Sequence, residues 1–103
     1  MQDPVARAEA IVQVVRYRFE STDAGRAEAL LRELRDASRK EKGVVAFDVG
    51  RSREDSNVFI LWEIYRDAAA LDEHAGTGHF RKLVVDGIRR LATERKAEFF
   101  SAL

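Results

Sequence analysis

The ionisable and aromatic side chains of this chain concentrate in residues 62–80, WEIYRDAAALDEHAGTGHF. This stretch holds both histidines of the chain, His74 and His79. An imidazole with an ordinary pKa of about 6.5 can accept a proton at neutral pH, so it suits general-base chemistry. His74 follows Leu71 at helical spacing, and both side chains therefore share one face, toward a sheet. We expect His74 to act as a catalytic base. The expected substrate contacts are Leu71, His79 and Phe80.

Both histidines also have a purely structural interpretation. His74 could anchor the loop that follows its helix, and His79 could hydrogen-bond the loop before the next helix. Asp72 and Glu73 stand beside His74, so a metal site is a further interpretation. The two histidines, however, are separated by a Gly-Thr-Gly break and do not form the i, i+4 pair of the H-E-x-x-H zinc motif. We therefore expect no metal.

Trp62 and Tyr65 each combine an aromatic ring with a hydrogen-bond donor. Their N–H and O–H groups could polarise a substrate oxygen and stabilise an oxyanion formed on it. They stand an odd number of positions apart on a predicted strand, so only one of them can face the site. Either could instead be an ordinary core residue. Glu63 must be paired if it is buried, and we expect an ion pair with Arg16 or Arg18 at a dimer surface.

Length and composition indicate one globular domain. The chain has 103 residues, of which 46% are hydrophobic and 35% are charged, and its formal net charge is zero. A neutral chain has no bulk electrostatic attraction to nucleic acid or to an anionic membrane, and no stretch is apolar enough to span a bilayer. The absence of cysteine excludes disulfides and thiol catalysis. We expect a cytoplasmic protein with a flexible segment at residues 1–9 and a single domain at residues 10–103.

Hydrophobic periodicity and turn signals predict alternating strands and helices. The expected strands cover residues 10–19, 44–51, 58–65 and 97–103. The expected helices cover residues 25–42, residues 68–75 and a long segment that starts after Thr77. Asp23, Asp67 and Thr77 are expected N-caps, and Gly76 is expected to end the short helix. Gly43 is expected to end the first helix in the left-handed conformation. The aromatic residues Tyr17, Phe47, Phe99 and Phe100 are expected in the core or at an interface.

This order of elements, β-α-β-β-α-β, is typical of the α+β ferredoxin-like fold with a four-stranded antiparallel sheet. The helices of that fold cover only one face of the sheet. The strands at 10–19 and 58–65 nevertheless carry apolar residues on both faces. A bare apolar face of that size is not expected on a soluble monomer. We therefore expect a homodimer in which the sheets of two copies pack together.

Residues 10–103 resemble the antibiotic biosynthesis monooxygenase family of dimeric α+β barrel proteins. The resemblance rests on LLRELRDASRKEKGVVAFDV (30–49), on FILWEIYRDAAALDEHAGTGHF (59–80) and on the order of the elements. It implies a small cavity between sheet and helices, and a dimer formed through the sheets. Several members oxidise phenolic, anthrone or quinol substrates with molecular oxygen and without a bound metal or flavin. The resemblance therefore implies a small aromatic ligand, no cofactor, a base for a phenolic proton and donors for the oxyanion.

Other activities of this superfamily fit the residues of this chain less well. Haem degradation uses an Asn on the first strand, a Trp on the short helix and a His ligand on the long helix. The matching positions here are Val15, His74 and Val84, so the iron ligand is missing. A sugar isomerase needs a phosphate site, and the helix start at Thr77 and Gly78 has no basic cluster beside it. RNA binding would need an RNP1 motif, which is absent. The remaining alternative is a non-catalytic dimeric module that binds a small aromatic ligand or has a structural role.

Overall fold

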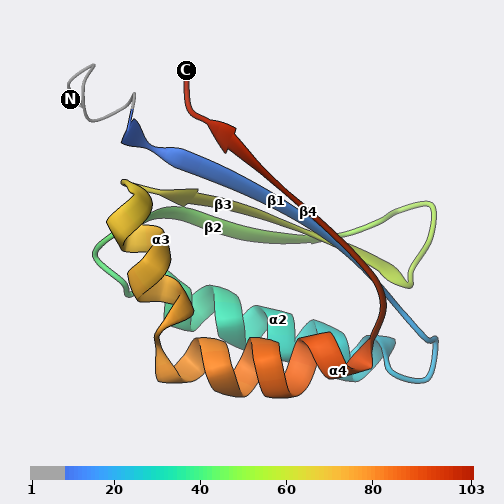
Figure 1. Cartoon of the computed structure of the whole chain (residues 1–103). Helices are drawn as coiled ribbons and strands as arrows, with labels where there is room; N and C mark the ends of the chain where they lie inside the picture. Colours follow the sequence, from blue (N-terminus) through green and yellow to red (C-terminus); the bar gives the residue numbers. More distant parts are fainter. Residues whose placement is uncertain (1–8) are drawn as a thin grey trace.

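The computed structural model describes residues 9–103, and its four strands form one antiparallel sheet in the order β2-β3-β1-β4 (Figure 1). The elements follow one another as β1 (Ile11–Phe19), α2 (Ala24–Ser38), β2 (Val44–Arg51), β3 (Val58–Tyr65), α3 (Ala68–Ala75), the π-helix η1 (Phe80–Ile88), α4 (Arg89–Leu91) and β4 (Ala92–Ser101). This arrangement confirms the predicted ferredoxin-like α+β fold. Within the described range, no helix has the length and apolar character needed to cross a membrane. The segment predicted to be flexible, residues 1–9, lies outside the described residues except for Glu9.

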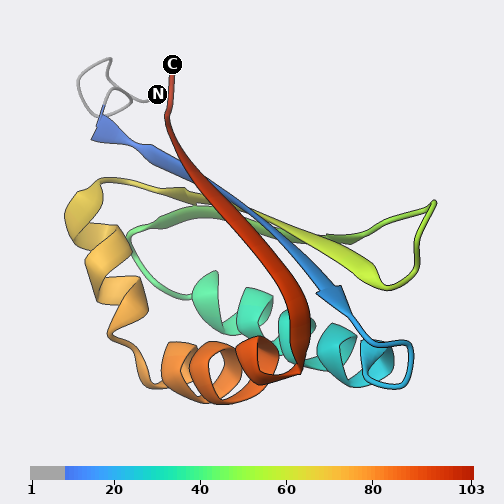
Figure 2. The same ribbon diagram turned by 45° about the vertical axis from the view of Figure 1, so that its right-hand side comes forward.

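All the helices lie on one side of the sheet, and the core fills the space between the two layers (Figures 1 and 2). Alternate residues of the two central strands point into this space, as the period of a strand requires. The helices contribute residues at helical spacing. The buried cluster contains Val15, Tyr17, Phe19, Ala24, Ala27, Leu31, Leu34, Phe47, Phe59, Leu61, Leu83, Val84 and Ile88.

The pairing of β1 with its two neighbours decides which side chains face the helices. Gln13 lies opposite Glu63 of β3 and opposite Phe99 of β4. Directly opposed residues share a face of the sheet, so these three side chains point together toward the helices. Val14 and Trp62 are the next pair along β1 and β3, and they point to the other face.

The end of α2 differs from the prediction. The helix ends at Ser38, and residues 39–43 form turns. Gly43 is not left-handed, and neither is any other glycine in residues 9–103. Glycine is needed here because there is no room for a side chain: a Cβ atom at Gly43 would lie 2.4 Å from the Cβ of Ala70 in α3. The glycine therefore lets the start of β2 approach α3 closely.

The predicted starts of α3 and of the following helix are confirmed. Oδ1 of Asp67 accepts a hydrogen bond from the N–H of Ala70 at 2.8 Å, and Oγ1 of Thr77 accepts one from Phe80 at 3.2 Å. Asp23 occupies the N-cap position of α2 but makes no capping bond with its side chain. These caps set the direction in which α3 and η1 leave the sheet.

The last strand is longer than predicted, because β4 begins at Ala92 rather than at residue 97. Its first half, ATERK, is polar and follows the exposed edge of the sheet, where an apolar pattern is not needed. Glu94 stabilises this half through Arg16 and Arg18 of β1, at 3.6 and 3.4 Å. The longer strand runs back beside β1 and forms one border of the space above the helices (Figure 2).

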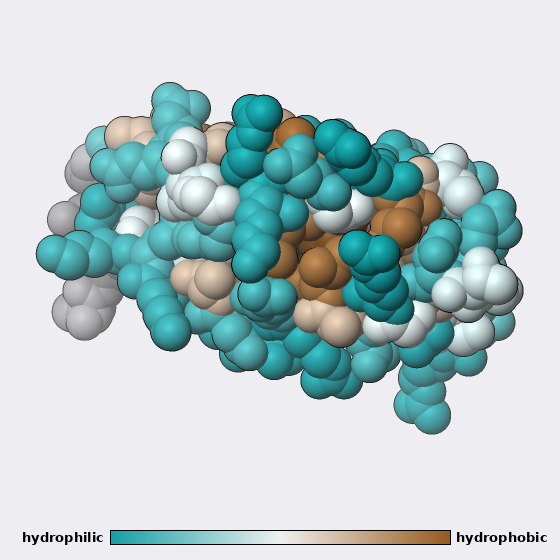
Figure 3. Space-filling model, turned by 90° about the horizontal axis from the view of Figure 1, so that it is seen from below, coloured by the Kyte–Doolittle hydropathy of each residue, from teal (hydrophilic) through white to brown (hydrophobic). Residues whose placement is uncertain are grey.

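The two sides of the molecule differ in character. Hydrophilic side chains cover most of the helix side, with a hydrophobic patch near its middle (Figure 3). On the sheet face that no helix covers, Trp62 is 47% exposed. The other large hydrophobic residues exposed there are Val45, Ile60 and Phe100. Trp62, Val45 and Phe100 border a groove of about 460 Å³ that Val12, Val14 and Ile64 also line. The apolar second face predicted from the sequence is therefore present.

Candidate active site

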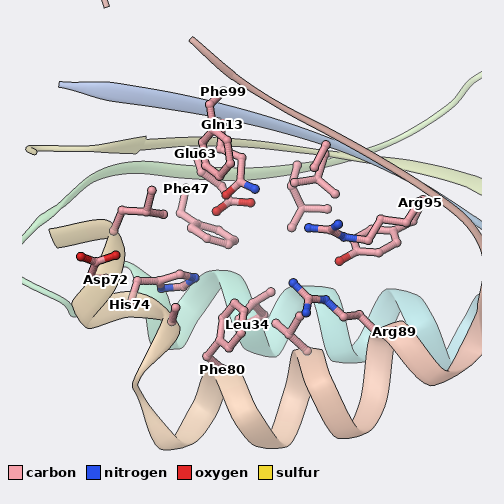
Figure 4. Close-up of a pocket in the computed structure, with 17 residues that line it drawn as sticks. Gln13, Leu34, Phe47, Glu63, Asp72, His74, Phe80, Arg89, Arg95 and Phe99 are labelled. Atoms are coloured by element: carbon pink, nitrogen blue, oxygen red, sulfur yellow. The ribbon is translucent and has the colours of Figure 1, made fainter. Parts of the chain in front are cut away.

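A cavity of about 410 Å³ lies between the sheet and the helices (Figure 4). All four strands and the helices contribute to its lining. Its apolar wall includes Val15, Leu34, Phe47, Leu61, Leu71, Phe80, Val84 and Ala97. Its polar lining consists of Gln13, Tyr17, Glu63, Asp72, His74, Arg89 and Arg95. The exposed lining residues belong to α3, α4 and β4, so the cavity opens to solvent along the β4 edge.

His74 projects from α3 into the apolar end of the cavity, between Phe47 and Phe80 (Figure 4). It is 3% exposed, and its ring centroid lies 5.7 Å from that of Phe47 and 5.2 Å from those of Phe80 and Tyr65. Burial lowers the pKa of His74, although the hydrogen bond and charge of Glu41 oppose this effect. The imidazole is therefore neutral at neutral pH and able to accept a proton.

Glu41 fixes the orientation of that imidazole. Its Oε2 lies 2.8 Å from Nδ1 of His74. A carboxylate can only accept, so Nδ1 carries the hydrogen and donates it. The lone pair of the neutral ring is then on Nε2, to which no residue in the range 9–103 donates a hydrogen bond. A cavity-lining residue thus has a free proton acceptor held in place by a carboxylate.

His79 lies behind this pair at the start of η1 and does not line the cavity. Its Nε2 lies 2.8 Å from the same Oε2 of Glu41. The ligand atoms of Glu41, His74 and His79 all lie within 4.8 Å of one another, and they are of the kinds that bind zinc or iron. Here Nδ1 of His74 and Nε2 of His79 both form a hydrogen bond with the Glu41 carboxylate. Hydrogen bonds among the three residues therefore account for the cluster.

Glu63 contradicts the prediction of an ion pair at the dimer surface. It is 4% exposed and lines the cavity on the helix side, where its Oε1 accepts the hydroxyl hydrogen of Tyr65. Its expected partners bond elsewhere, since Arg18 pairs with Asp55 at 2.7 Å and Arg16 with Glu94. Burial raises the pKa of Glu63 to about 7, against the hydrogen bond from Tyr65 and the charge of Arg95.

The two aromatic donors of β3 lie on opposite faces, as their spacing predicts. Tyr65 faces the helices and is fully buried, but its hydroxyl is bonded to Glu63 and does not line the cavity. Trp62 lies on the uncovered face. The aromatic hydroxyl that lines the cavity belongs to Tyr17, which is 3% exposed and makes no side-chain hydrogen bond to the described residues. Tyr17 was expected only as a core or interface residue.

Two arginines stand at the open side of the cavity. The guanidinium carbon of Arg89 lies 5.5 Å from the ring centroid of Phe80, a cation–π contact. Arg95 projects from β4 toward the space between the layers (Figure 4). Neither arginine lies within salt-bridge distance of a carboxylate of the described residues, whereas Arg16, Arg18 and Arg39 are paired. The part of the opening between α4 and β4 is therefore electropositive and suits an anionic group, whereas Asp72 lies on the α3 side.

The structure thus brings together part of the predicted site. His74, Leu71 and Phe80 line one cavity, whereas Trp62, Tyr65 and His79 do not. The cavity residues missed by sequence reasoning are Gln13, Tyr17, Arg89 and Arg95, and Glu41 was missed behind it. Glu63 gave a usable signal, because a carboxylate amid the odd-numbered apolar residues of β3 points into the core. Glu41 gave none, since its contact with His74 spans two elements.

The sequence signature of the antibiotic biosynthesis monooxygenase family matches residues 10–85. No curated protein matches the chain. Among solved structures, a conserved protein of unknown function from Bacteroides thetaiotaomicron, described as a possible oxidoreductase, is 33% identical with a TM-score of 0.86. The match covers 91% of this chain and 98% of that protein.

Two further structures show the same likeness. A protein from Pseudomonas aeruginosa is 29% identical, with a TM-score of 0.86 and coverage of 94% of this chain and 97% of that one. A crystal structure named antibiotic biosynthesis monooxygenase is 26% identical, with a TM-score of 0.83 and coverage of 90% and 98%. The likeness to these solved structures therefore extends over at least 90% of the chain, and the family signature over residues 10–85.

Proposed function

The chain belongs to the antibiotic biosynthesis monooxygenase family, and from this premise we propose that it is a cofactor-independent monooxygenase. The proposed substrate is a small phenol, anthrone or quinol, oxidised with molecular oxygen. The observation that carries this proposal is the neutral His74 in the cavity wall, with one ring nitrogen bound by Glu41 and the other free.

The proposed reaction begins with proton transfer from a substrate hydroxyl to Nε2 of His74. The resulting oxyanion is electron-rich enough to reduce molecular oxygen. For a methylene substrate such as an anthrone, one oxygen atom replaces the two methylene hydrogens as a carbonyl and the other leaves with them as water. In this proposal the apolar wall holds the aromatic ring, with Leu71 and Phe80 among its contacts, and keeps bulk water from the anion.

The oxyanion needs hydrogen-bond donors or positive charge at the cavity wall. We assign this role to the hydroxyl of Tyr17 and to the guanidinium of Arg95, which both line the cavity. Tyr65 acts indirectly in this proposal, since it positions Glu63. His79 likewise acts through Glu41 rather than by touching the substrate.

Oxygen uptake with a panel of quinols and anthrones tests the proposal. We expect His74→Gln to lower the rate by about 10²-fold or more, the usual contribution of a general base. Glu73→Gln is the matched control, because Glu73 is exposed, adjacent in sequence and outside the cavity lining. Equal rates for the wild type and His74→Gln, or uptake from neither, would contradict the role of His74.

The alternative is a non-catalytic dimeric module that binds a small aromatic ligand. The largely apolar lining of the cavity fits this function equally well. The two functions separate when binding and oxygen uptake are measured on the same compounds. Binding without uptake across the panel would favour the module.

We also propose that two copies pair through the uncovered sheet face, as expected for this family. The supporting observation is the large apolar surface there, at which Trp62 and Phe100 are nearly half exposed. A second copy would bury these side chains against identical ones around a two-fold axis. The zero net charge of the chain adds no electrostatic barrier to this association.

A further inference from the structure

We propose that Glu63 is a second substrate-contacting base, which binds a hydroxyl group of the substrate through its free carboxylate oxygen. Tyr65 is the positioning residue that holds the other oxygen. This inference rests on the proposed function for the class of substrate, a hydroxylated aromatic compound. It goes beyond that function because it assigns a residue, and a second hydroxyl, that His74 does not require.

The first support is the position of the carboxylate. Glu63 is 4% exposed, yet it lines the cavity together with its cross-strand neighbour Gln13 (Figure 4). Oε1 accepts the Tyr65 hydroxyl. Oε2 bonds to no described residue. It is accessible from the cavity, because the Ser38 hydroxyl is the only fully buried side-chain oxygen or nitrogen without a hydrogen-bond partner in residues 9–103. A carboxylate oxygen that faces a cavity and has no protein partner can accept a hydrogen bond from a hydroxyl group of a bound ligand.

The second support is the charge around the carboxylate. Arg95 of β4 favours its ionised form, whereas Glu41, from the turn after α2, opposes it. From the helices, His74 and Asp72 of α3 and Arg89 of α4 line the same cavity. Burial is the strongest influence, and it brings the pKa of Glu63 to about 7. The group can therefore take up and release a proton under ordinary conditions, as a catalytic base must.

The proposed step is a simple proton transfer. The O–H bond of the substrate breaks and its electron pair stays on the substrate oxygen. The proton forms a new O–H bond on Oε2 of Glu63, so the total charge inside the cavity does not change. His74 and Glu63 then offer two proton acceptors in one cavity. Two acceptors favour quinols among the proposed substrates, because a quinol loses two protons when it is oxidised.

Binding of 2-naphthol and of its methyl ether tests this assignment without any oxygen chemistry. Isothermal titration calorimetry would compare the two probes between pH 5 and about 8, where 2-naphthol itself stays neutral. We expect the wild type to prefer the hydroxyl compound by about tenfold or more at the upper pH, as a hydrogen bond to a charged group implies. This preference should weaken as the pH falls through 7 and Glu63 is protonated.

Three variants make the test specific. Glu63→Gln keeps the shape and should show a small preference that does not change as the pH passes through 7, while His74→Gln should keep the change there. Tyr65→Phe removes the hydrogen bond that lowers the pKa of Glu63, so the change should move to higher pH. Equal behaviour of the wild type and Glu63→Gln, or no preference in the wild type, would overturn the proposal. A Glu63-dependent preference without oxygen uptake would support it and contradict only the monooxygenase reaction.

Discussion

Nδ1 of His74 lies 2.8 Å from Oε2 of Glu41, a residue 33 positions earlier in the sequence. The turn after α2 brings the carboxylate under the end of α3, and the same oxygen also meets His79. A carboxylate, an oriented imidazole and a free ring nitrogen facing a cavity form the arrangement by which many enzymes present a base. The orientation of His74 thus depends on a residue that never touches the cavity.

Replacement of Glu41 should therefore weaken the base without altering the cavity wall. We expect Glu41→Gln to lower the pKa of His74 further, because Glu41 raises it by its hydrogen bond and charge. The rate of oxygen uptake should fall by about tenfold or more, since general-base catalysis depends on position. NMR titration of the His74 ring and oxygen uptake check the two parts. A His74 that titrates as in the wild type would contradict the proposed role of Glu41.

Glu63 should make the stability of the fold depend on pH. Its pKa is about 7 in the folded chain, above its ordinary value of 4.5, so the folded state binds more protons than the unfolded state between these values. The stabilisation is fully present below the unfolded pKa and is lost as the pH rises toward 7. At pH 8, Glu63→Gln should be more stable than the wild type by up to about 3 kcal/mol. The difference should disappear near pH 4 in urea denaturation, and a constant difference would argue against a buried, titrating Glu63.

Gly43→Ala should destabilise the protein. The added methyl group would lie 2.4 Å from the Cβ of Ala70, so β2 and α3 must move apart. Overpacking of this kind typically costs about 1–3 kcal/mol. Gly25→Ala is the matched control, because nothing lies within 4 Å of its Cβ position and the helix favours alanine. Equal melting temperatures for the two variants would show that the contact with Ala70 is easily relieved.

Trp62→Glu should abolish the proposed dimer. A charge in the middle of the uncovered apolar face cannot be buried against its own copy without a large desolvation cost. Light scattering at micromolar concentration should then give the monomer mass for the variant and twice that mass for the wild type. Arg81→Glu adds negative charge at an exposed position of η1 and should leave the mass unchanged. A monomeric wild type would refute the pairing of the sheets.

Most of the fold could be predicted because its signals are local. Alternation in β1 and β3, and the caps Asp67 and Thr77, depend on residues within one element. The predictions were wrong at positions whose structure depends on contacts with another element. Gly43 follows a helix, but glycine is needed there because Ala70 of α3 leaves no room for a side chain. The charged start of β4 is a strand because it pairs with β1.

In the candidate site, too, the features with local signals could be predicted and those that depend on distant contacts could not. The inward direction of His74 follows from helical spacing. Its contact with Glu41 depends on how the turn after α2 meets the end of α3, which no spacing along the sequence encodes. Glu63 was assigned to the wrong face because its charge outweighed the register of its neighbours Leu61 and Tyr65. Periodicity was the better guide in this case, since side chains of a strand alternate whatever their polarity.

The alternation along β3 also restricts changes in the length of this strand. Trp62 and Glu63 are adjacent in sequence, yet one belongs to the proposed contact with a second copy and the other to the cavity. Insertion or deletion of a single residue within this strand would exchange the two surfaces, placing the carboxylate outside and the indole inside. Length changes during evolution should therefore be excluded from β3 but tolerated in the loop at residues 52–57, where the chain can absorb them without reversing the sheet.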